Sequence, residues 1–275
     1  MFTFAQFQQL SIDFFGYGLV FWGLELLTHY TEFKPLRRGA LNDILHFFTN
    51  SILRVVILGA VVSLSYRYAQ DLILFDLAAR LENLWLPLVF LGALFAEQFG
   101  FYWAHRWSHE IPFLWKFHAV HHTIEEMDWL STNRAHPFDN LFLRILGFGP
   151  VFLFGFSPQM YLFALTVQGV SALFIHSNCR FRFGFAEKIL ATPFYHQWHH
   201  SYDVFNKNYC SLFAFFDLLF GTYYSPAARP AKLGISQNVP ATNFLFQLLY
   251  PLESNLYNHK VFAQKRVPTP ANPST

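Results

Sequence analysis

Residues 194–203 read FYHQWHHSYD, and residues 117–126 read FHAVHHTIEE. Each stretch places three histidines within five positions: His196, His199 and His200 in the first, and His118, His121 and His122 in the second. Side chains three or four residues apart lie on one face of a helix. Because helices use this spacing to present imidazoles to a metal ion, the two stretches predict a metal site around which the chain folds.

The stretch AHRWSH at 104–109 adds His105 and His109, which a four-residue step also places on one helical face. So many imidazoles would repel one another if protonated, and bound cations would keep them neutral. Eight clustered histidines are too many for one ion with about four ligands, so the pattern predicts two metal ions. Imidazole suits zinc, copper, iron and nickel alike, and the spacing leaves the element open.

The composition is that of a membrane protein. Hydrophobic residues make up 53% of the 275 residues and charged residues 13%, against a usual charged share of roughly 25%. Several apolar stretches are longer than the core helices of a soluble helical enzyme, which is the alternative class. The fold class expected is therefore all-α, an integral membrane helical bundle. Five apolar segments carry this expectation, at about 14–27, 44–66, 84–104, 141–156 and 160–175.

The charges between these segments predict the orientation of the chain. The first connection, TEFKPLRRG at 31–39, carries Lys34, Arg37 and Arg38, whereas the residues before it contain no Lys or Arg. The positive-inside rule places this connection in the cytoplasm. The third segment then returns the chain to the cytoplasm near His105, and a hairpin at about 141–175 would keep the later histidines on the same side. We therefore expect a cytoplasmic, histidine-rich di-metal cap on a multi-pass protein of a bacterial inner membrane or the endoplasmic reticulum.

Three regions are expected along the chain. Residues 1–93 supply N-terminal membrane helices, 94–225 form the histidine-containing catalytic region, and 226–275 form a C-terminal segment with a disordered tail. The net charge of +2 gives no electrostatic case for nucleic acid as a partner. The sequence contains no GxGxxG and no CxxCH haem-attachment motif, so electrons for any redox reaction must come from a separate reductase or small carrier.

The order of the histidine motifs resembles the fatty acid hydroxylase/sterol desaturase superfamily. The motifs are HRWSH, FHAVHH, NRAHP, FIHSN and TPFYHQWHH, followed by NKNYCSLFAFFDLLFGTYY at 206–224, and together they cover about Leu94 to Tyr224. The arrangement is most similar to alkylglycerol monooxygenase-type and related bacterial members. The resemblance implies a di-iron membrane enzyme that uses O2 to hydroxylate or desaturate a lipid that arrives from the bilayer.

The resemblance also implies which residues bind the two iron ions and act in catalysis. By position they are His105, His109, His118, His121, His122, His176, His196, His199 and His200. His136 either lines the site or binds metal. Arg134 either holds a carboxylate or lipid head group or forms a structural salt bridge. Asp217 is expected to orient a metal-binding histidine.

Two departures from the family pattern leave the electron donor and the substrate open. The family commonly has Asp-x-Asn-Tyr-Gly where this chain has Asn206 to Cys210, and an acid where this chain has Gln98, beside Glu97. The function expected is hydroxylation of a fatty acyl, alkylglycerol or sterol-like C–H bond. The alternatives are a desaturase with the same site and a non-enzymatic metal-binding or metal-transport membrane protein, whose ligands would be spread along a transmembrane path.

Overall fold

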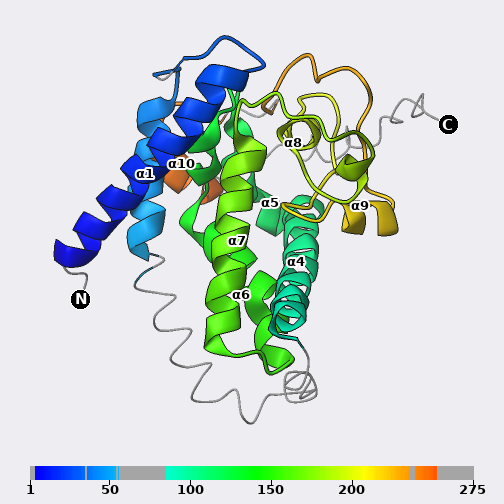
Figure 1. Ribbon diagram of the computed structural model, residues 1–275. Helices are drawn as coiled ribbons and strands as arrows, with labels where there is room; N and C mark the ends of the chain where they lie inside the picture. Colours follow the sequence, from blue (N-terminus) through cyan, green and yellow to red (C-terminus); the bar gives the residue numbers. More distant parts are fainter. Residues whose placement is uncertain (1–3, 35, 54, 56–84, 236–238, 253–275) are drawn as a thin grey trace.

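The computed structural model describes residues 4–34, 36–53, 55, 85–235 and 239–252 (Figure 1). Within these ranges the chain is helical and forms no strand, with only isolated bridges between His29 and Cys179 and between Ser201 and Leu233. The all-α fold expected from the sequence is confirmed. The predicted disordered tail, and the part of the second apolar segment at 56–66, lie outside the described residues.

Long helices form the bundle. They are α1 (Phe4–Thr28), a helix over 40–53, α4 (Leu86–Glu110), α6 (Pro137–Leu153) and α7 (Pro158–His176). The other α-helices are short. They are α5 (Pro112–His118), which lies between α4 and α6, and α8 (Pro193–His199), α9 (Phe215–Leu219) and α10 (Phe244–Leu249), which follow α7. Single 3-10 turns cover His121–Thr123, Trp129–Asn133, Gly184–Lys188 and Tyr250–Leu252.

The helix starts follow from local chemistry. Proline occupies the first turn of α4, α5, α6, α7 and α8, where its missing N–H removes no helical hydrogen bond. Ser157 caps α7 by accepting from the N–H of Met160, and Thr192 caps α8 by accepting from the N–H of Tyr195. The cap therefore sets Pro193 as the first residue of α8, and the helix start in turn sets the direction in which His196 and His199 point.

Three helices of the described chain are long and apolar enough to cross a membrane: Gln8–Thr28, Leu86–Glu110 and Gln159–His176. Large apolar side chains such as Leu19, Leu27 and Leu91 are exposed on them. Such exposure is expected where lipid replaces water around a helix. The predicted pair at 141–175 forms two antiparallel helices, α6 and α7, joined by a short turn that ends at Ser157.

The helices α4, α6 and α7 pack closely around one apolar core. At Gly100 a Cβ atom would lie 2.6 Å from the carbonyl oxygens of both Gly147 and Leu146, so α4 and α6 touch backbone to backbone. Only glycine permits this approach. In Figure 1, α4 and α7 run in the same direction, and their carboxyl ends lie near α5 and α8. The bundle thereby gathers helix ends from distant parts of the sequence.

Candidate metal centre

The nine histidines predicted to bind metal all lie together, and each is buried. They form two groups in which the potential ligand atoms lie within 4.8 Å of one another. The five-histidine group comprises His105, His109, His118, His122 and His199, and the four-histidine group comprises His121, His176, His196 and His200. The rings of His122 and His200 stack with centroids 4.4 Å apart and join the two groups.

The local helices divide the motifs between the groups. We expected residues 118–122 to present their imidazoles from one helical face, and this is wrong. Helix α5 ends at His118, and His121 and His122 follow on a 3-10 turn. The turn sends His121 to the four-histidine group while its neighbours join the other.

The motif at 196–200 is split in a similar way. Helix α8 ends at His199, and His200 is its C-cap. Within this motif His196 and His200 share a group, while His199 lies with the histidines of α4. Both five-residue motifs therefore contribute to both groups. In each of them the two histidines four residues apart share a group, and the third histidine joins the other group.

Hydrogen bonds hold the Nδ1 atoms of several rings, whereas those of His196 and His200 have no partner among the described residues. Four rings donate to backbone carbonyls: His105 to Tyr209 at 2.6 Å, His121 to Arg134 at 2.9 Å, His176 to Ala172 at 2.8 Å and His199 to Lys207 at 2.8 Å. A carbonyl oxygen can only accept, so the proton of each neutral ring is on Nδ1. The Nε2 atom of each ring therefore carries a free lone pair.

The Nε2 atoms of the histidines face one another within each group, and no proton lies between those of His121 and His176, since both rings carry their proton on Nδ1. Within the groups they lie 3.0–3.3 Å apart, as in the pairs His105–His118 at 3.1 Å and His121–His176 at 3.1 Å. A metal bonded to nitrogens at about 2.0–2.1 Å would hold neighbouring nitrogens roughly 3.0–3.4 Å apart. The lone pairs repel unless a cation binds them, so both groups fit a metal ion.

Burial keeps the rings neutral. It lowers the pKa of His121 to about 4, with His118 as the next contribution. Burial also lowers the pKa of His122, His196, His199 and His200 well below the ordinary value. Because a metal binds only the unprotonated nitrogen, this environment favours metal binding at neutral pH.

The sequence interpretation missed Asp139. This carboxylate is buried in the first turn of α6, and its Oδ2 accepts a hydrogen bond from Nδ1 of His118 at 3.0 Å. Burial raises the pKa of Asp139 to about 6. It is thus ionised at neutral pH and places a negative charge behind one ring of the five-histidine group.

Asp217 contacts no histidine among the described residues. It accepts hydrogen bonds from the backbone N–H groups of Tyr209 and Cys210, and from the hydroxyl groups of Tyr195 and Thr222. The carbonyl of the same Tyr209 accepts from His105. The expected contact with a histidine is therefore replaced by an indirect one, in which Asp217 fixes the loop that holds the ring.

That loop is shaped by two asparagines. Asn206 and Asn208 have φ angles of 57° and 60°, in the left-handed region that asparagine tolerates better than most residues. The side chain of Asn208 binds the carbonyls of Tyr195 and Tyr224 and the N–H of Tyr224. The carbonyl of the intervening Lys207 is thereby turned toward His199. The segment that departs from the family pattern thus supports two histidines.

His136 and Arg134 lie outside both groups. His136 caps α6 through the N–H of Phe138, and its Nε2 lies 3.2 Å from the carbonyl of Leu248. The Arg134 guanidinium forms a buried ion pair with Asp43 at 2.5 Å, so of the two predicted roles it has the structural one. Its backbone carbonyl, rather than its side chain, touches the site through His121.

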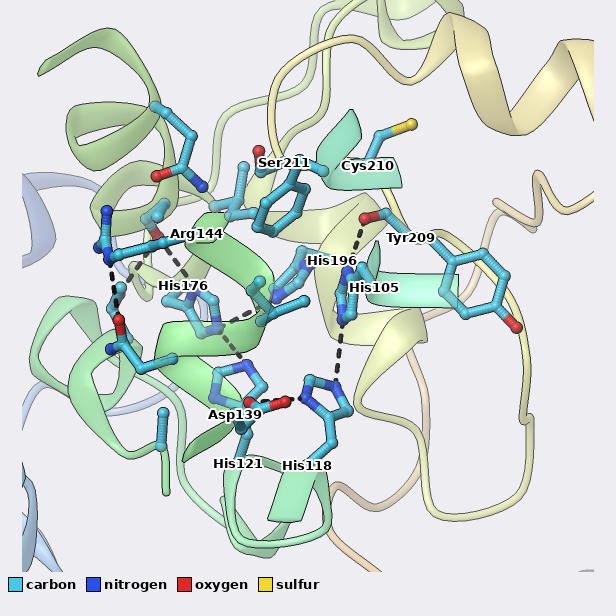
Figure 2. A pocket seen from close by; sticks show the side chains of 18 of the residues that line it. His105, His118, His121, Asp139, Arg144, His176, His196, Tyr209, Cys210 and Ser211 are labelled. Atoms are coloured by element: carbon cyan, nitrogen blue, oxygen red, sulfur yellow. Dashed lines mark hydrogen bonds and ion pairs between the residues drawn. The ribbon is translucent and has the colours of Figure 1, made fainter. Parts of the chain in front are cut away.

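A cavity of about 110 Å³ opens beside the histidines between α4, α6 and α7. Figure 2 shows rings of both groups at one side of it, with Asp139 against His118 and with Arg144 on another side. Apolar side chains, including Phe101, Leu143 and Phe148, form much of the remaining wall. The arrangement offers a buried, largely apolar space next to two candidate metal positions.

Comparison with known proteins identifies the class. The fatty acid hydroxylase family matches residues 90–222, which include all nine histidines. A "putative methylsterol monooxygenase" of Dictyostelium discoideum is 32% identical over 205 residues, covering 69% of this chain and 73% of that protein. The chain therefore belongs to the fatty acid hydroxylase family, and the predicted resemblance is confirmed.

Two other relatives are shorter matches. The chain is 39% identical over 167 residues to ornithine lipid hydroxylase OlsE of Rhizobium tropici, covering 59% of this chain and 50% of that protein. It is 32% identical over 139 residues to human alkylglycerol monooxygenase, covering 50% of this chain and 31% of that protein. The chain thus spans half or less of the length of these two relatives. No solved structure is significantly similar to it.

Proposed function

We propose that this protein is an O2-dependent membrane oxygenase that hydroxylates a C–H bond of a lipid at a di-iron site. The observation that carries the proposal is the pair of buried histidine groups, whose facing Nε2 atoms could each hold a metal ion. Support comes from the relatives, since the names of the three compared describe lipid hydroxylases or monooxygenases. Unactivated C–H bonds need an oxidant that no side chain supplies.

The nine histidines would hold the iron ions. Two reduced irons, when bound, supply the electrons and the coordination positions needed to activate O2. Imidazoles are neutral donors, so they leave the site more cationic than the mixed Glu and His sets of soluble di-iron bundles. Asp139 partly offsets this positive charge, because its carboxylate accepts from Nδ1 of His118. The Nδ1 atoms of His105, His121, His176 and His199 donate to neutral carbonyls instead.

The rest of the chain would orient the lipid and exclude water. Hydrogen bonds at Nδ1 hold five of the rings before substrate binds, namely His105, His118, His121, His176 and His199. Apolar walls such as Phe101 and Phe148 exclude water from the cavity. A cavity of about 110 Å³ is smaller than the engineered cavity of about 150 Å³ that accommodates benzene. This volume favours a narrow alkyl or acyl segment over the fused rings of a sterol.

We further propose that the site faces the cytoplasm of a multi-pass protein. His109 and His176 lie in the last turns of two candidate spans, α4 and α7, so the histidines gather at one end of the bundle. Lys34, Arg37 and Arg38 follow α1, and the positive-inside rule favours the cytoplasm for them. A separate reductase or small carrier on that side would supply electrons.

Metal analysis and isotope labelling test the proposal. Protein purified without chelator should contain two metal ions per chain, mainly iron, and one zinc per chain would contradict a di-iron site. Lipids extracted from cells that express the protein under 18O2 should contain one labelled oxygen. A product two hydrogens lighter and unlabelled would indicate a desaturase instead. Metal without any O2-dependent lipid product would favour a metal-binding protein.

A further inference from the structure

The cavity contains polar side chains away from the histidines. Glu97 on α4 and Gln168 on α7 both line it, with exposed fractions of 1% and 6%. Arg144 on α6 lines it as well and donates from Nε to Asn140 at 2.8 Å. Polar side chains inside helices long enough to span a membrane are expensive, and they commonly mark a functional site.

Glu97 and Gln168 lie at a common depth in the bundle. Glu97 precedes His105 by eight residues on α4, and Gln168 precedes His176 by eight residues on α7. A rise of 1.5 Å per residue places each about 12 Å along its helix from the histidine that follows. In Figure 1, α4 and α7 run in the same direction. The two residues therefore precede the histidines of their helices by the same distance, on the same side.

The described residues leave hydrogen-bonding atoms of the Glu97 and Gln168 side chains without partners. The side-chain amide of Gln168 has no hydrogen-bond partner among the described residues, although it is buried and faces the cavity. The carboxyl group of Glu97 is bound through Oε2 by the amide of Gln98 at 2.6 Å. Leaving a buried amide unsatisfied is costly, and a bound group that satisfies it gains that free energy.

We infer that Glu97 and Gln168 bind a hydroxyl or amine group of the lipid substrate, several bonds from the carbon that lies at the histidines. The inference rests on the proposed function and adds a substrate class to it. A hydroxyl or amine has an O–H or N–H to donate to the Glu97 carboxyl group, and its lone pair can accept from the Gln168 amide. An unfunctionalised hydrocarbon segment would leave both groups unsatisfied.

Binding of matched lipids to the full chain tests this. The iron-loaded protein in nanodiscs, kept under nitrogen to prevent turnover, is offered hexadecanol, hexadecylamine or hexadecyl methyl ether, and retained lipid is measured by native mass spectrometry. The alcohol and amine should bind roughly 10-fold more tightly than the ether, which lacks a donor. Gln168→Leu and Glu97→Leu, which remove the amide and the acceptor, should reduce that preference, whereas Thr166→Val, on the exposed face of α7, should leave it unchanged.

The outcomes separate this inference from the proposed function. Equal binding of the three lipids, binding of none, or an unchanged preference in both variants would overturn the role of Glu97 and Gln168, since water alone would then satisfy the amide. Metal content and 18O2 labelling of cell lipids are measured separately and would still decide whether the protein is a di-iron oxygenase. Metal content of the variants equal to that of the unaltered protein confirms that they fold.

Discussion

Asp139 provides the sharpest prediction about the metal centre. Its carboxylate accepts the Nδ1–H of His118 at 3.0 Å in a buried position, which makes a charge-assisted hydrogen bond. Asp139→Asn keeps a carbonyl oxygen that can accept the same proton but removes the charge. Charged and neutral hydrogen bonds differ by about 1–1.5 kcal/mol, so the variant should bind metal roughly 10-fold more weakly. Asp139→Leu removes the acceptor as well and should weaken binding by up to about 100-fold.

The assay is titration of metal-free protein with iron in competition with a chelator of known affinity, followed by metal analysis. The loss should fall on one of the two ions, because His118 belongs to the five-histidine group alone. Glu187→Gln is the matched control: this buried acid pairs with Arg182 and contacts no histidine among the described residues. Unchanged affinity for both ions in Asp139→Leu would refute the argument that the carboxylate strengthens His118 as a ligand.

Three further predictions concern the bundle. Removing metal with a chelator should lower the thermal transition of the protein, because the facing Nε2 lone pairs then repel, and returning iron should restore it. Burial lowers the pKa of His121 to about 4, so protonation of this ring alone should destabilise the metal-free protein by up to roughly 3 kcal/mol as the pH falls from 6.5 to 4, and the other buried histidines should add to that loss. Denaturant titrations at several pH values would measure the loss, and above pH 6.5 these rings should have no effect. Gly100→Ala should lower the free energy of unfolding by about 1–3 kcal/mol, because its Cβ would meet the backbone of Gly147, whereas Gly149→Ala, with open space around it, should be neutral or stabilising.

The metal-binding histidines could be proposed from the sequence because spacing within a helix is a local property. Where a stretch is helical, as AHRWSH is in α4, a four-residue step places two rings on one face. The division into two groups could not be predicted, because it depends on where the helices stop. Helix α5 ends at His118, and the turn that follows redirects His121 by a change of backbone conformation that the HxxHH spacing does not reveal.

Asp139 was missed because its position has an ordinary explanation. An acid in the first turn of a helix is favoured by the helix dipole, so HPFDN predicts no more than a helix start. Its functional contact comes from His118, which is 21 residues away and on another helix. A carboxylate at the start of an apolar segment, within a chain of few charges, was the available signal.

Arg134 and Asp217 show why the supporting residues were harder to predict than the ligands. Both were expected to act through their side chains, yet the atoms that hold the rings are the carbonyls of Arg134 and Tyr209, and the side chains act by fixing the backbone. Every residue has a carbonyl, so no residue type marks this role in a sequence. Carbonyl acceptors also have a physical advantage here: they fix the proton on Nδ1 without adding a charge to a buried, largely apolar site. A neutral set of rings can then be assembled at one end of the bundle. Among the described residues, Asp139 is the carboxylate that bonds a ring, and it distinguishes the five-histidine group from the other.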